Sequence, residues 1–467
     1  MRLDSLLDDV EVLHLEGDPT TDIADVTYSS DEARPGSLFC CVPGGRTDGH
    51  EHALDAVDRG AVALIVERQL TTPKAEVAQV RVRDARASMA PIAAAFHGHP
   101  SQALDVVGVT GTNGKSTTTY LVRAILEADG RRCGVIGSMN SARTTPEAPE
   151  LQGRLASFVG DGMQAAAIEV SSVGLARHRV DAVRFAAGVF TNLSVDELTI
   201  HGTMDDYFAA KARLFEAGRS EVGVVNADDE WGTLLLDRAA IRMVPYSLAD
   251  ASGLDVTPSG STFTWRNELV SFAVEGAYNV SNALAAATTC VELGVDVAVI
   301  ARALSDFEPL PGHGEVIDAG QPFRVVVDFA HTAGALTAVL GAARRAASRD
   351  GRVIVVFGCG GDRDRARRAP MGEAAARAAD VVVVTSDNPR TEDPLAIVDE
   401  VAAGARPHND DVRVVPDRRE AVALALHEAR PGDVVVIAGK GHETGQIVGT
   451  EVLPFDDRDV VGEVLGS

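Results

Sequence analysis

The sequence is poor in lysine, in metal-spaced cysteine and in long apolar runs, and each shortage excludes something. Only four of its 43 basic residues are lysine, and the rest are arginine; the four are Lys74, Lys115, Lys211 and Lys440. The five cysteines show no metal-ligand spacing and are expected to be reduced thiols, as in a cytoplasm. No run of about 20 apolar residues occurs, so no membrane span is expected. The charged N-terminal stretch is not expected to act as a signal peptide.

Positive charge is scarce over the whole chain. The net charge of −25 argues against a general nucleic-acid binder, because a phosphate backbone requires a basic face. The 45% of hydrophobic and 24% of charged residues are typical of a globular protein. A length of 467 residues suggests about three domains. We therefore expect a soluble, cytoplasmic, monomeric enzyme that holds anionic ligands with local positive groups.

The expected fold is α/β in three domains, over residues 1–100, 101–310 and 311–467. Short apolar runs such as "AVALIVE" predict a small N-terminal α/β domain. From residue 104, runs such as "LDVVGV" and "AAAIEV" are separated by helical stretches, which predicts a parallel sheet covered on both faces. The Pro- and Gly-rich break "FEPLPGHGE" precedes a second such series, predicted to be Rossmann-like. Ligands of such sheets bind at the carboxyl ends of the strands.

The segment "GVTGTNGKSTTT" predicts a phosphate-binding loop between a strand and a helix. Backbone N–H groups of such a loop surround phosphate oxygens, the lysine neutralises them, and the hydroxyl after it ligates Mg²⁺. The strict spacing is not met, because Val109 stands where the first glycine belongs, and a Gly-rich turn with an exposed lysine is the alternative. The residues expected to bind ATP here are Gly111, Thr112, Asn113, Gly114, Lys115, Ser116 and Thr117.

These motifs together resemble the Mur ligases, the ATP-dependent amide-forming enzymes of peptidoglycan precursor synthesis, and most of all their MurE type. The resemblance extends over nearly the whole chain and includes "YSSDEARPGSLF", "EVSS", "YFAAKARLF", "NVSNALAA", "DFAHT", "GCGGDRDR", "TSDNPR" and "IAGKGHE". It implies an N-terminal domain for the UDP-muramoyl substrate, a central ATP-binding domain and a C-terminal amino-acid-binding domain. It also implies a role in cell-wall biogenesis, and so in cell shape and cell division.

The resemblance implies a ligation in two steps. ATP phosphorylates a carboxylate of UDP-N-acetylmuramoyl-L-alanyl-D-glutamate (UDP-MurNAc-dipeptide) to an acyl phosphate, and an amine of meso-diaminopimelate then attacks it. The implied catalytic residues are Lys115, Glu169 and Lys211. In the family this last lysine is carbamylated by CO₂, and the carbamate helps to hold Mg²⁺ together with Ser116, Glu169 and Glu197. A guanidinium does not react in this way, which would explain why position 211 is not arginine.

From the residues alone, Lys211 and Glu169 could also have purely structural roles. Lys211 could lie on the solvent face of an amphipathic helix, and Glu169 could be a structural acid that caps a neighbouring helix. Lys74 lies in a polar segment and is expected to face solvent. Lys440 receives no role from the sequence.

The resemblance assigns the remaining substrate contacts. For ATP they are Asn279 and Asn282 at adenine and Asp328 at ribose; for the UDP-muramoyl dipeptide they are Ser30 with the loop "GGRTDGH", Thr144, Thr145, Ser171 and Arg179; for the amino acid they are Arg363, Asp387, Asn388, Pro389, Arg390, Gly439 and Glu443. The distal end of meso-diaminopimelate carries a carboxylate, which Arg390 can bind as a fork, and an ammonium, which Glu443 can accept. The alternative is that "NPR" is only a turn with a solvated arginine.

Three positions depart from the family pattern. Glu197 replaces a histidine that ligates the second Mg²⁺, and glutamate can do the same. His313 replaces an arginine expected to contact the ATP phosphates, and Val173 replaces a histidine. Two alternatives to a diaminopimelate ligase therefore stay open: a diverged Mur ligase with another acceptor, and a non-catalytic Mur-like binding protein. The segment "SSDEARPGSLF" argues against a folate-type enzyme, which has no use for a uridine-nucleotide module.

Overall fold

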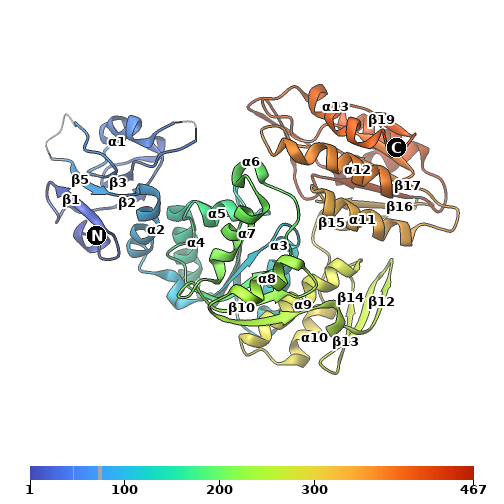
Figure 1. The fold of residues 1–467 in the computed structure, drawn as a ribbon, viewed down its shortest axis with the longest axis horizontal. Coiled ribbons are helices and arrows are strands. Elements are labelled where there is room, and N and C mark those ends of the chain that lie inside the picture. Colours follow the sequence, from blue (N-terminus) through green and yellow to red (C-terminus); the bar gives the residue numbers. More distant parts are fainter. Residues whose placement is uncertain (46, 72–75, 467) are drawn as a thin grey trace.

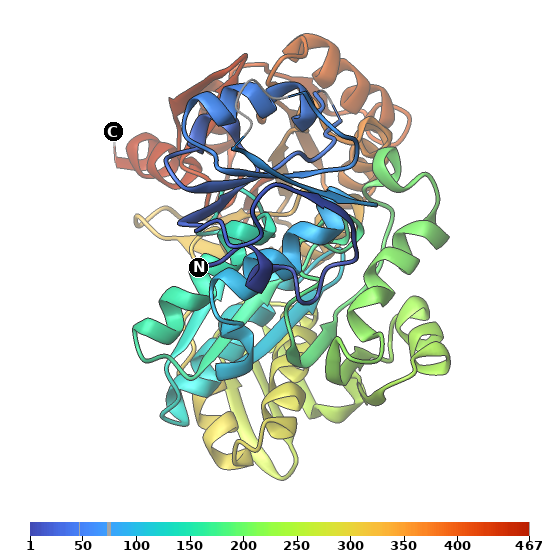
Figure 2. The ribbon, with the colours of Figure 1, turned by 90° about the vertical axis from the view of Figure 1, so that its left-hand side faces the viewer.

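A computed structural model describes residues 1–45, 47–71 and 76–466 of the chain. The predicted mixed α/β fold is confirmed: a small N-terminal unit and a C-terminal unit lie on different sides of a central one (Figure 1). Viewed from the N-terminal side, the first sheet lies in front of the rest (Figure 2). Lys74, expected in solvent, and Arg46 of the "GGRTDGH" loop lie outside the described residues. No described helix combines the length and apolarity needed to cross a membrane.

The N-terminal unit is a five-stranded sheet in the order β1-β5-β4-β3-β2, parallel except where β1 pairs with β5. All four residues of β4, "ALIV", are buried, as expected for a strand covered on both faces. Its elements are β1 (Val12–Glu16), β2 (Asp25–Thr27), β3 (Ser37–Cys40), α1 (Ala53–Asp58), β4 (Ala63–Val66), β5 (Ala78–Val82) and α2 (Ala85–Phe96).

The central unit is a six-stranded sheet in the order β11-β10-β9-β6-β8-β7, with every neighbouring pair parallel. Because β6 lies between β9 and β8, the loop that leaves its carboxyl end is flanked by the ends of both neighbours. The elements are β6 (Asp105–Thr110), α3 (Lys115–Ala128), β7 (Cys133–Ile136), α4 (Ala148–Gly160), β8 (Ala165–Glu169), α5 (Ser172–Ala176), β9 (Phe185–Phe190), α6 (Leu198–His201), α7 (Met204–Ala212), β10 (Ser220–Asn226), α8 (Glu230–Arg238), β11 (Arg242–Tyr246), α9 (Ala277–Glu292) and α10 (Val297–Ser305).

A small antiparallel sheet, which the sequence did not lead us to expect, is inserted after β11. Its inward side chains, Phe263, Trp265 and Phe272, join the core that includes α9 and α10. The alternation of buried and exposed residues is that of a sheet with one covered face. Its strands are β12 (Ser252–Thr257), β13 (Gly260–Trp265) and β14 (Glu268–Phe272).

The C-terminal unit is a six-stranded sheet in the order β15-β16-β20-β17-β18-β19, parallel except for β15. The runs "VIVVF", "VVVV" and "VVVIA" are wholly buried, as expected for strands covered by helices on both faces. The elements are β15 (His313–Ile317), β16 (Arg324–Asp328), α11 (Ala333–Ala346), β17 (Val353–Phe357), α12 (Arg368–Ala378), β18 (Val381–Val384), α13 (Pro394–Ala405), β19 (Val412–Val414), α14 (Arg418–Glu428), β20 (Val434–Ala438), β21 (Gly445–Val448), β22 (Glu451–Pro454) and α15 (Asp457–Gly466).

Polar contacts join the units near the phosphate loop. Thr332 Oγ1 of the C-terminal unit donates to Asn113 Oδ1 at 3.1 Å. Leu198 N of the central unit donates to Asp364 Oδ2 at 2.9 Å. The C-terminal unit therefore lies directly against the loop that follows β6. The domain boundaries at residues 100 and 310 stay a prediction.

Candidate active site

The loop between β6 and α3 has a backbone that only glycine can follow at two points. Gly111 has φ +147° and Gly114 has φ +84°. A Cβ would lie 1.9 Å from Thr191 Oγ1 at the first position and 2.3 Å from Asn282 Oδ1 at the second. No side chain caps the start of α3, which is the arrangement in which the N–H groups of a first helical turn bind an anion.

A cavity of about 440 Å³ opens on this loop, between the central and C-terminal units. Its volume lies in the range of small-molecule sites. Among the described residues no arginine lines it, so Lys115 and Lys211 are its only lysine or arginine side chains. The predicted site residues that line it are Gly111, Thr112, Asn113, Gly114, Lys115, Ser116, Thr117, Thr144, Glu169, Ser171, Glu197, Lys211, Asn279, Asn282 and Asp328, with His313 and Val173 beside them.

Glu169 ends β8 as a buried carboxylate next to the loop serine. Its Oε1 accepts from Ser116 Oγ at 2.9 Å and from Ser138 N and Oγ, both at 3.0 Å. Burial raises the pKa of Glu169 above its ordinary value, although Lys115 and these donors act against the rise. A buried carboxylate beside a serine hydroxyl is a suitable pair of ligands for a hard cation. Ser138 was not identified from the sequence, where its only signal is that it follows the run "CGVIG".

Lys211 is buried, so the interpretation that it lies on the solvent face of α7 is wrong. Its side chain is 1% exposed, and Nζ donates to Gly111 O at 2.8 Å. The amine also lies 4.6 Å from the centre of the Tyr207 ring. Burial, aided by the charge of Lys115, holds the pKa of Lys211 well below its usual range. A lowered pKa increases the share of the neutral amine, which is the form that reacts with CO₂.

Two consecutive acids, Asp196 and Glu197, also line the cavity. Asp196 is buried and pairs with Arg367 Nη1 of the C-terminal unit at 3.4 Å. Glu197 has a left-handed backbone, with φ +56°, and burial together with Asp196 raises its pKa. Asp196 was not selected from the sequence, and its signal was its place beside Glu197 in "VDELTIH". In the described part of the chain no three His, Cys, Asp or Glu side chains converge as a metal site.

His313 does not supply the positive charge of the arginine that it replaces. Its Nε2 lies 3.1 Å from His442 Nδ1, and the two rings stack with centres 5.2 Å apart. Burial, with His442 and His331 nearby, lowers the pKa of His313 to about 3, so the ring is neutral at physiological pH. Asp328, paired with it across β15 and β16, has its pKa raised to about 6 by burial.

The residues expected at the UDP-muramoyl dipeptide divide into two groups. Thr144 and Ser171 line the cavity, whereas Thr145 is fully buried and its Oγ1 donates to Glu169 O, at the end of β8, at 2.8 Å. Arg179 donates to Thr145 O at 2.9 Å and pairs with Glu147 at 2.8 Å. Glu147 also binds Arg86 Nη1 at 3.0 Å, so these buried charges join α2 to the central unit. Ser30 begins a short 3₁₀ helix in the N-terminal unit and does not line this cavity.

The residues expected at the amino acid form a second cluster, at the carboxyl ends of β17, β18 and β20. Arg390 has a left-handed backbone, φ +52°, and its Nη1 donates to Gly361 O at 2.8 Å. A Cβ on Gly360 would lie 2.9 Å from Arg390 Nη1 and 3.4 Å from Arg363 Cγ, so the two arginines converge there. Burial and the charge of Arg363 lower the pKa of Arg390. Two neighbouring guanidinium groups suit a carboxylate ligand.

Lys440 joins two of the predicted amino-acid motifs. It is fully buried, and Nζ donates to Gly445 O at 2.7 Å, Glu443 Oε2 at 2.9 Å and Asn388 Oδ1 at 3.3 Å. Asn388 Nδ2 in turn donates to Glu443 Oε2 at 2.8 Å. Burial alone would raise the pKa of Glu443, but Lys440 and Asn388 hold it below the ordinary value. A compact ammonium with three donors fits this pocket, which explains a third lysine.

Asp387 and Gly439 meet in the same cluster. A Cβ on Gly439 would lie 2.9 Å from Asp387 Oδ2, and the glycine has φ +108°. Gln446 Nε2 donates to Asp387 O at 2.7 Å, which ties the β21 strand to this loop. The carbonyl of Pro389 packs against Gly361. A Cβ added at Gly361 would lie only 1.9 Å from Pro389 O, so only glycine fits there. The structure therefore brings all seven predicted amino-acid residues to one edge of the C-terminal sheet.

Comparisons with known proteins agree along the whole chain. Residues 22–97 match the Mur ligase family catalytic domain, 109–290 the Mur ligase middle domain and 314–441 the Mur ligase glutamate ligase domain. The UDP-N-acetylmuramoyl-L-alanyl-D-glutamate–2,6-diaminopimelate ligase of Geobacillus thermodenitrificans is 41% identical, over 96% of this chain and 95% of that one. A solved structure of a ligase with the same name is 31% identical with a TM-score of 0.68, over 100% and 99% of the two chains. A MurF ligase from Thermotoga maritima, solved with ADP, shares the fold at 20% identity, TM-score 0.64 and 95% and 96% coverage.

Proposed function

The chain belongs to the Mur ligase family, and we propose that it is the ATP-dependent ligase which joins meso-diaminopimelate to UDP-MurNAc-dipeptide in peptidoglycan precursor synthesis. One observation carries the proposal: the phosphate loop and the Arg363–Arg390 pair lie on facing units that are in contact. Asp364, next to Arg363, accepts the backbone N–H of Leu198, next to Glu197. Substrates are small molecules, and we expect a monomer that works in the cytoplasm.

The residues of the cavity suit the activation of a carboxylate by ATP. Lys115 and the uncapped start of α3 would bind the phosphates, and the fact that Asn279, Asn282 and Asp328 line the same cavity supports their expected role at adenosine. The γ-phosphoryl group passes to the substrate carboxylate, and ADP leaves. The amine then attacks the acyl carbon, phosphate leaves, and the amine loses a proton as the amide forms. Positioning and charge neutralisation supply most of the rate enhancement in such transfers.

The donor set fits Mg²⁺ better than a metal held by protein alone. Mg²⁺ in phosphoryl-transfer sites takes one or two carboxylates and completes its shell with water and phosphate oxygens. Ser116, Glu169 and Glu197 would hold it, and burial raises the pKa of both carboxyl groups, whose negative charge a bound cation would offset. Bound Mg²⁺ would neutralise the charge that develops on the phosphates. We infer that CO₂ carbamylates Lys211, whose buried amine faces the same cavity.

A phosphate-release assay tests the function. With ATP, Mg²⁺ and UDP-MurNAc-dipeptide present, we expect phosphate release to depend on added meso-diaminopimelate and to yield the tripeptide product by mass spectrometry. Lys115→Ala should abolish both signals. Phosphate release that no amino acid stimulates would contradict the proposal and favour a binding protein. Stimulation by another amine alone would favour a diverged acceptor.

Glu197 gives a separate prediction about the metal. Glu197→Gln removes a charge that we expect to hold Mg²⁺, so the Mg²⁺ concentration for half-maximal activity should rise about tenfold, which corresponds to about 1.4 kcal/mol. The KM for meso-diaminopimelate should change much less. The measurement is a Mg²⁺ titration of phosphate release at saturating substrates. An unchanged Mg²⁺ requirement would show that Glu197 is not a ligand.

A further inference from the structure

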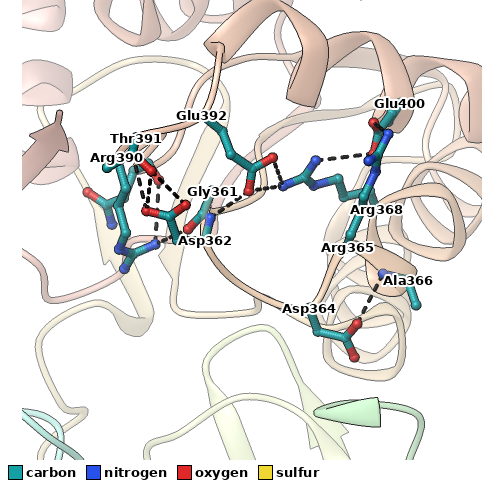
Figure 3. Close-up of polar contacts among 11 residues, drawn as sticks. Gly361, Asp362, Asp364, Arg365, Ala366, Arg368, Arg390, Thr391, Glu392 and Glu400 are labelled. Carbon is teal, nitrogen blue, oxygen red and sulfur yellow. Dashed lines mark hydrogen bonds and ion pairs between the residues drawn. The ribbon is translucent and has the colours of Figure 1, made fainter. Parts of the chain in front are cut away.

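Two loops of the C-terminal unit are cross-linked by a carboxylate that no substrate role accounts for. One loop follows β17 and carries Arg363, and the other follows β18 and carries Arg390. Glu392 belongs to the second loop, and its carboxylate points between Asp362 of the first loop and Arg368 (Figure 3). Its Oε1 accepts from Asp362 N at 2.6 Å, and its two oxygens accept from Arg368 Nη2 at 2.9 and 2.8 Å. Glu392 therefore connects the backbone of the first loop to a residue of α12.

Arg368, at the start of α12, holds the carboxylate of Glu392 in place through the two hydrogen bonds from Nη2. Its side chain is 2% exposed, and Nη1 donates to Glu400 Oε2 of α13 at 3.1 Å. Arginine is the first residue of α12, where the helix dipole disfavours a positive charge, and no protein group pairs with its buried Nε within the described chain. A buried charge in such a place requires its acidic partners. Loss of Glu392 would leave Arg368 with Glu400 alone.

The segments held together in this way contain two residues in an unfavourable conformation. Asp362 has φ +51° and Arg390 has φ +52°, a left-handed region that non-glycine residues rarely enter. Thr391 Oγ1 donates to Asp362 Oδ1 at 2.9 Å, and Gly361 N donates to Asn388 O at 2.9 Å. Strained backbone persists only where surrounding contacts determine it, and it is concentrated at functional sites. The contacts here determine the positions of both substrate arginines.

We propose that Glu392, held by Arg368, is a positioning residue that sets the separation of Arg363 and Arg390 and thereby the selectivity for a substrate with a distal carboxylate. The identity of that substrate rests on the proposed function. Glu392 acts through the Asp362 backbone, which immediately precedes Arg363, and through Thr391, which immediately follows Arg390. A fork that binds a carboxylate tolerates little error, because a displacement of about 1 Å can cost roughly 10²-fold in rate.

The test compares Glu392 variants with a matched control. In Glu392→Ala we expect the KM for meso-diaminopimelate to rise by roughly tenfold to a hundredfold. The KM values for ATP and for UDP-MurNAc-dipeptide should stay within about twofold, because the phosphate cavity is untouched. Glu392→Gln keeps an acceptor for Asp362 N and should show a smaller rise. Glu400→Gln weakens the other ion pair of Arg368 and an exposed pair with Arg365, but it keeps Glu392 and its bond to Asp362 N, so it should leave all three KM values within about twofold.

Each outcome decides between positioning and simple structural support. A structural role alone predicts that Glu392→Ala and Glu400→Gln lower the melting temperature and leave the KM values unchanged, and that result would overturn the inference. A rise in all three KM values would also overturn it, since the effect would not be confined to the amino acid. Wild-type protein assayed in parallel must show release that depends on meso-diaminopimelate; if it does not, the proposed function fails and the inference fails with it. If Glu392→Ala does not fold, Glu392→Gln provides the comparison.

Discussion

Lys211→Ala and Lys211→Arg should both be folded and nearly inactive, with activity reduced on the order of 10²–10³-fold, as when a key electrostatic group is lost. Neither side chain can become a carbamate. Arginine would moreover place a permanent positive charge in the buried site next to the Gly111 carbonyl. Lys211 differs, because burial lowers its pKa and so favours loss of its proton. Activity is measured as phosphate release, and folding by circular dichroism and thermal melting.

The fold of the Lys211→Ala variant should be preserved for an electrostatic reason. A lysine whose pKa is lowered in the folded state opposes folding at every pH below its ordinary value, because the unfolded chain binds a proton that the folded chain resists. Removal of the amine removes that penalty at pH 7, although it leaves some space in the core. Loss of activity in this variant would therefore reflect chemistry more than unfolding.

Two controls separate a carbamate from an ordinary lysine. Acetate or another short carboxylic acid should partly restore Lys211→Ala by filling the space with an anion, and it should not restore Lys211→Arg, whose side chain still fills the site. Wild-type activity should fall when CO₂ and bicarbonate are removed and return when bicarbonate is added. Substantial activity in Lys211→Arg would mean that the residue acts as a cation and that the carbamate proposal is wrong.

Wild-type protein should use meso-diaminopimelate at least about 10²-fold more efficiently than L-lysine, measured as kcat/KM. L-lysine is meso-diaminopimelate without the distal carboxylate, so it would leave the converging Arg363 and Arg390 without an anion. Arg390 is half-buried and Arg363 is exposed, so a bound L-lysine would cover these charges without an anion to pair them; leaving such covered groups unmatched typically costs about 1–3 kcal/mol, and more when they are charged. Burial and the neighbouring charge of Arg363 both lower the pKa of Arg390, so an anionic partner would be favourable there.

Substitution of Arg390 should remove most of this preference. Arg390→Ala should lower kcat/KM for meso-diaminopimelate by roughly 10²-fold and leave the weak use of L-lysine little changed. Arg365→Ala is the matched control, because it removes an arginine of the same unit that is exposed and bound to Glu400. Equal use of both amino acids by wild type, or an equal loss in the two variants, would show that Arg390 does not select the substrate.

The sequence was sufficient for the sheet architecture but not for the small sheet of β12–β14. Buried parallel strands are written as continuous apolar runs such as "VVVIA", which are easily recognised. The strands of the small sheet are covered on one face only and alternate polar with apolar residues over five or six positions. So short an alternation is too weak a signal to distinguish a strand from a loop.

The same limit applies to the site. Motifs placed Lys115, Glu169 and Lys211 around one cavity, because each lies next to a strand end or in a recognisable helix. The role of Lys440 could not be predicted, because it depends on a hydrogen bond to Asn388, 52 residues away in the chain. The neutral state of His313 depends likewise on stacking against His442, 129 residues away. A single sequence does not show which residues far apart in the chain come into contact in the fold.

The C-terminal unit lines part of the phosphate cavity, and this affects how much ATP the reaction would use for each amide bond. An acyl phosphate is open to attack by water, and an enzyme that forms one wastes ATP whenever water arrives before the amine. Here the unit that carries the amino-acid residues also contributes Phe329, Ala330 and Gly334 to the cavity. If the proposed function holds, one unit would both cover the intermediate and deliver the amine. The C-terminal unit would bring the attacking amine with it when it covers the cavity. An acyl phosphate that is shielded from water would then also face its amine.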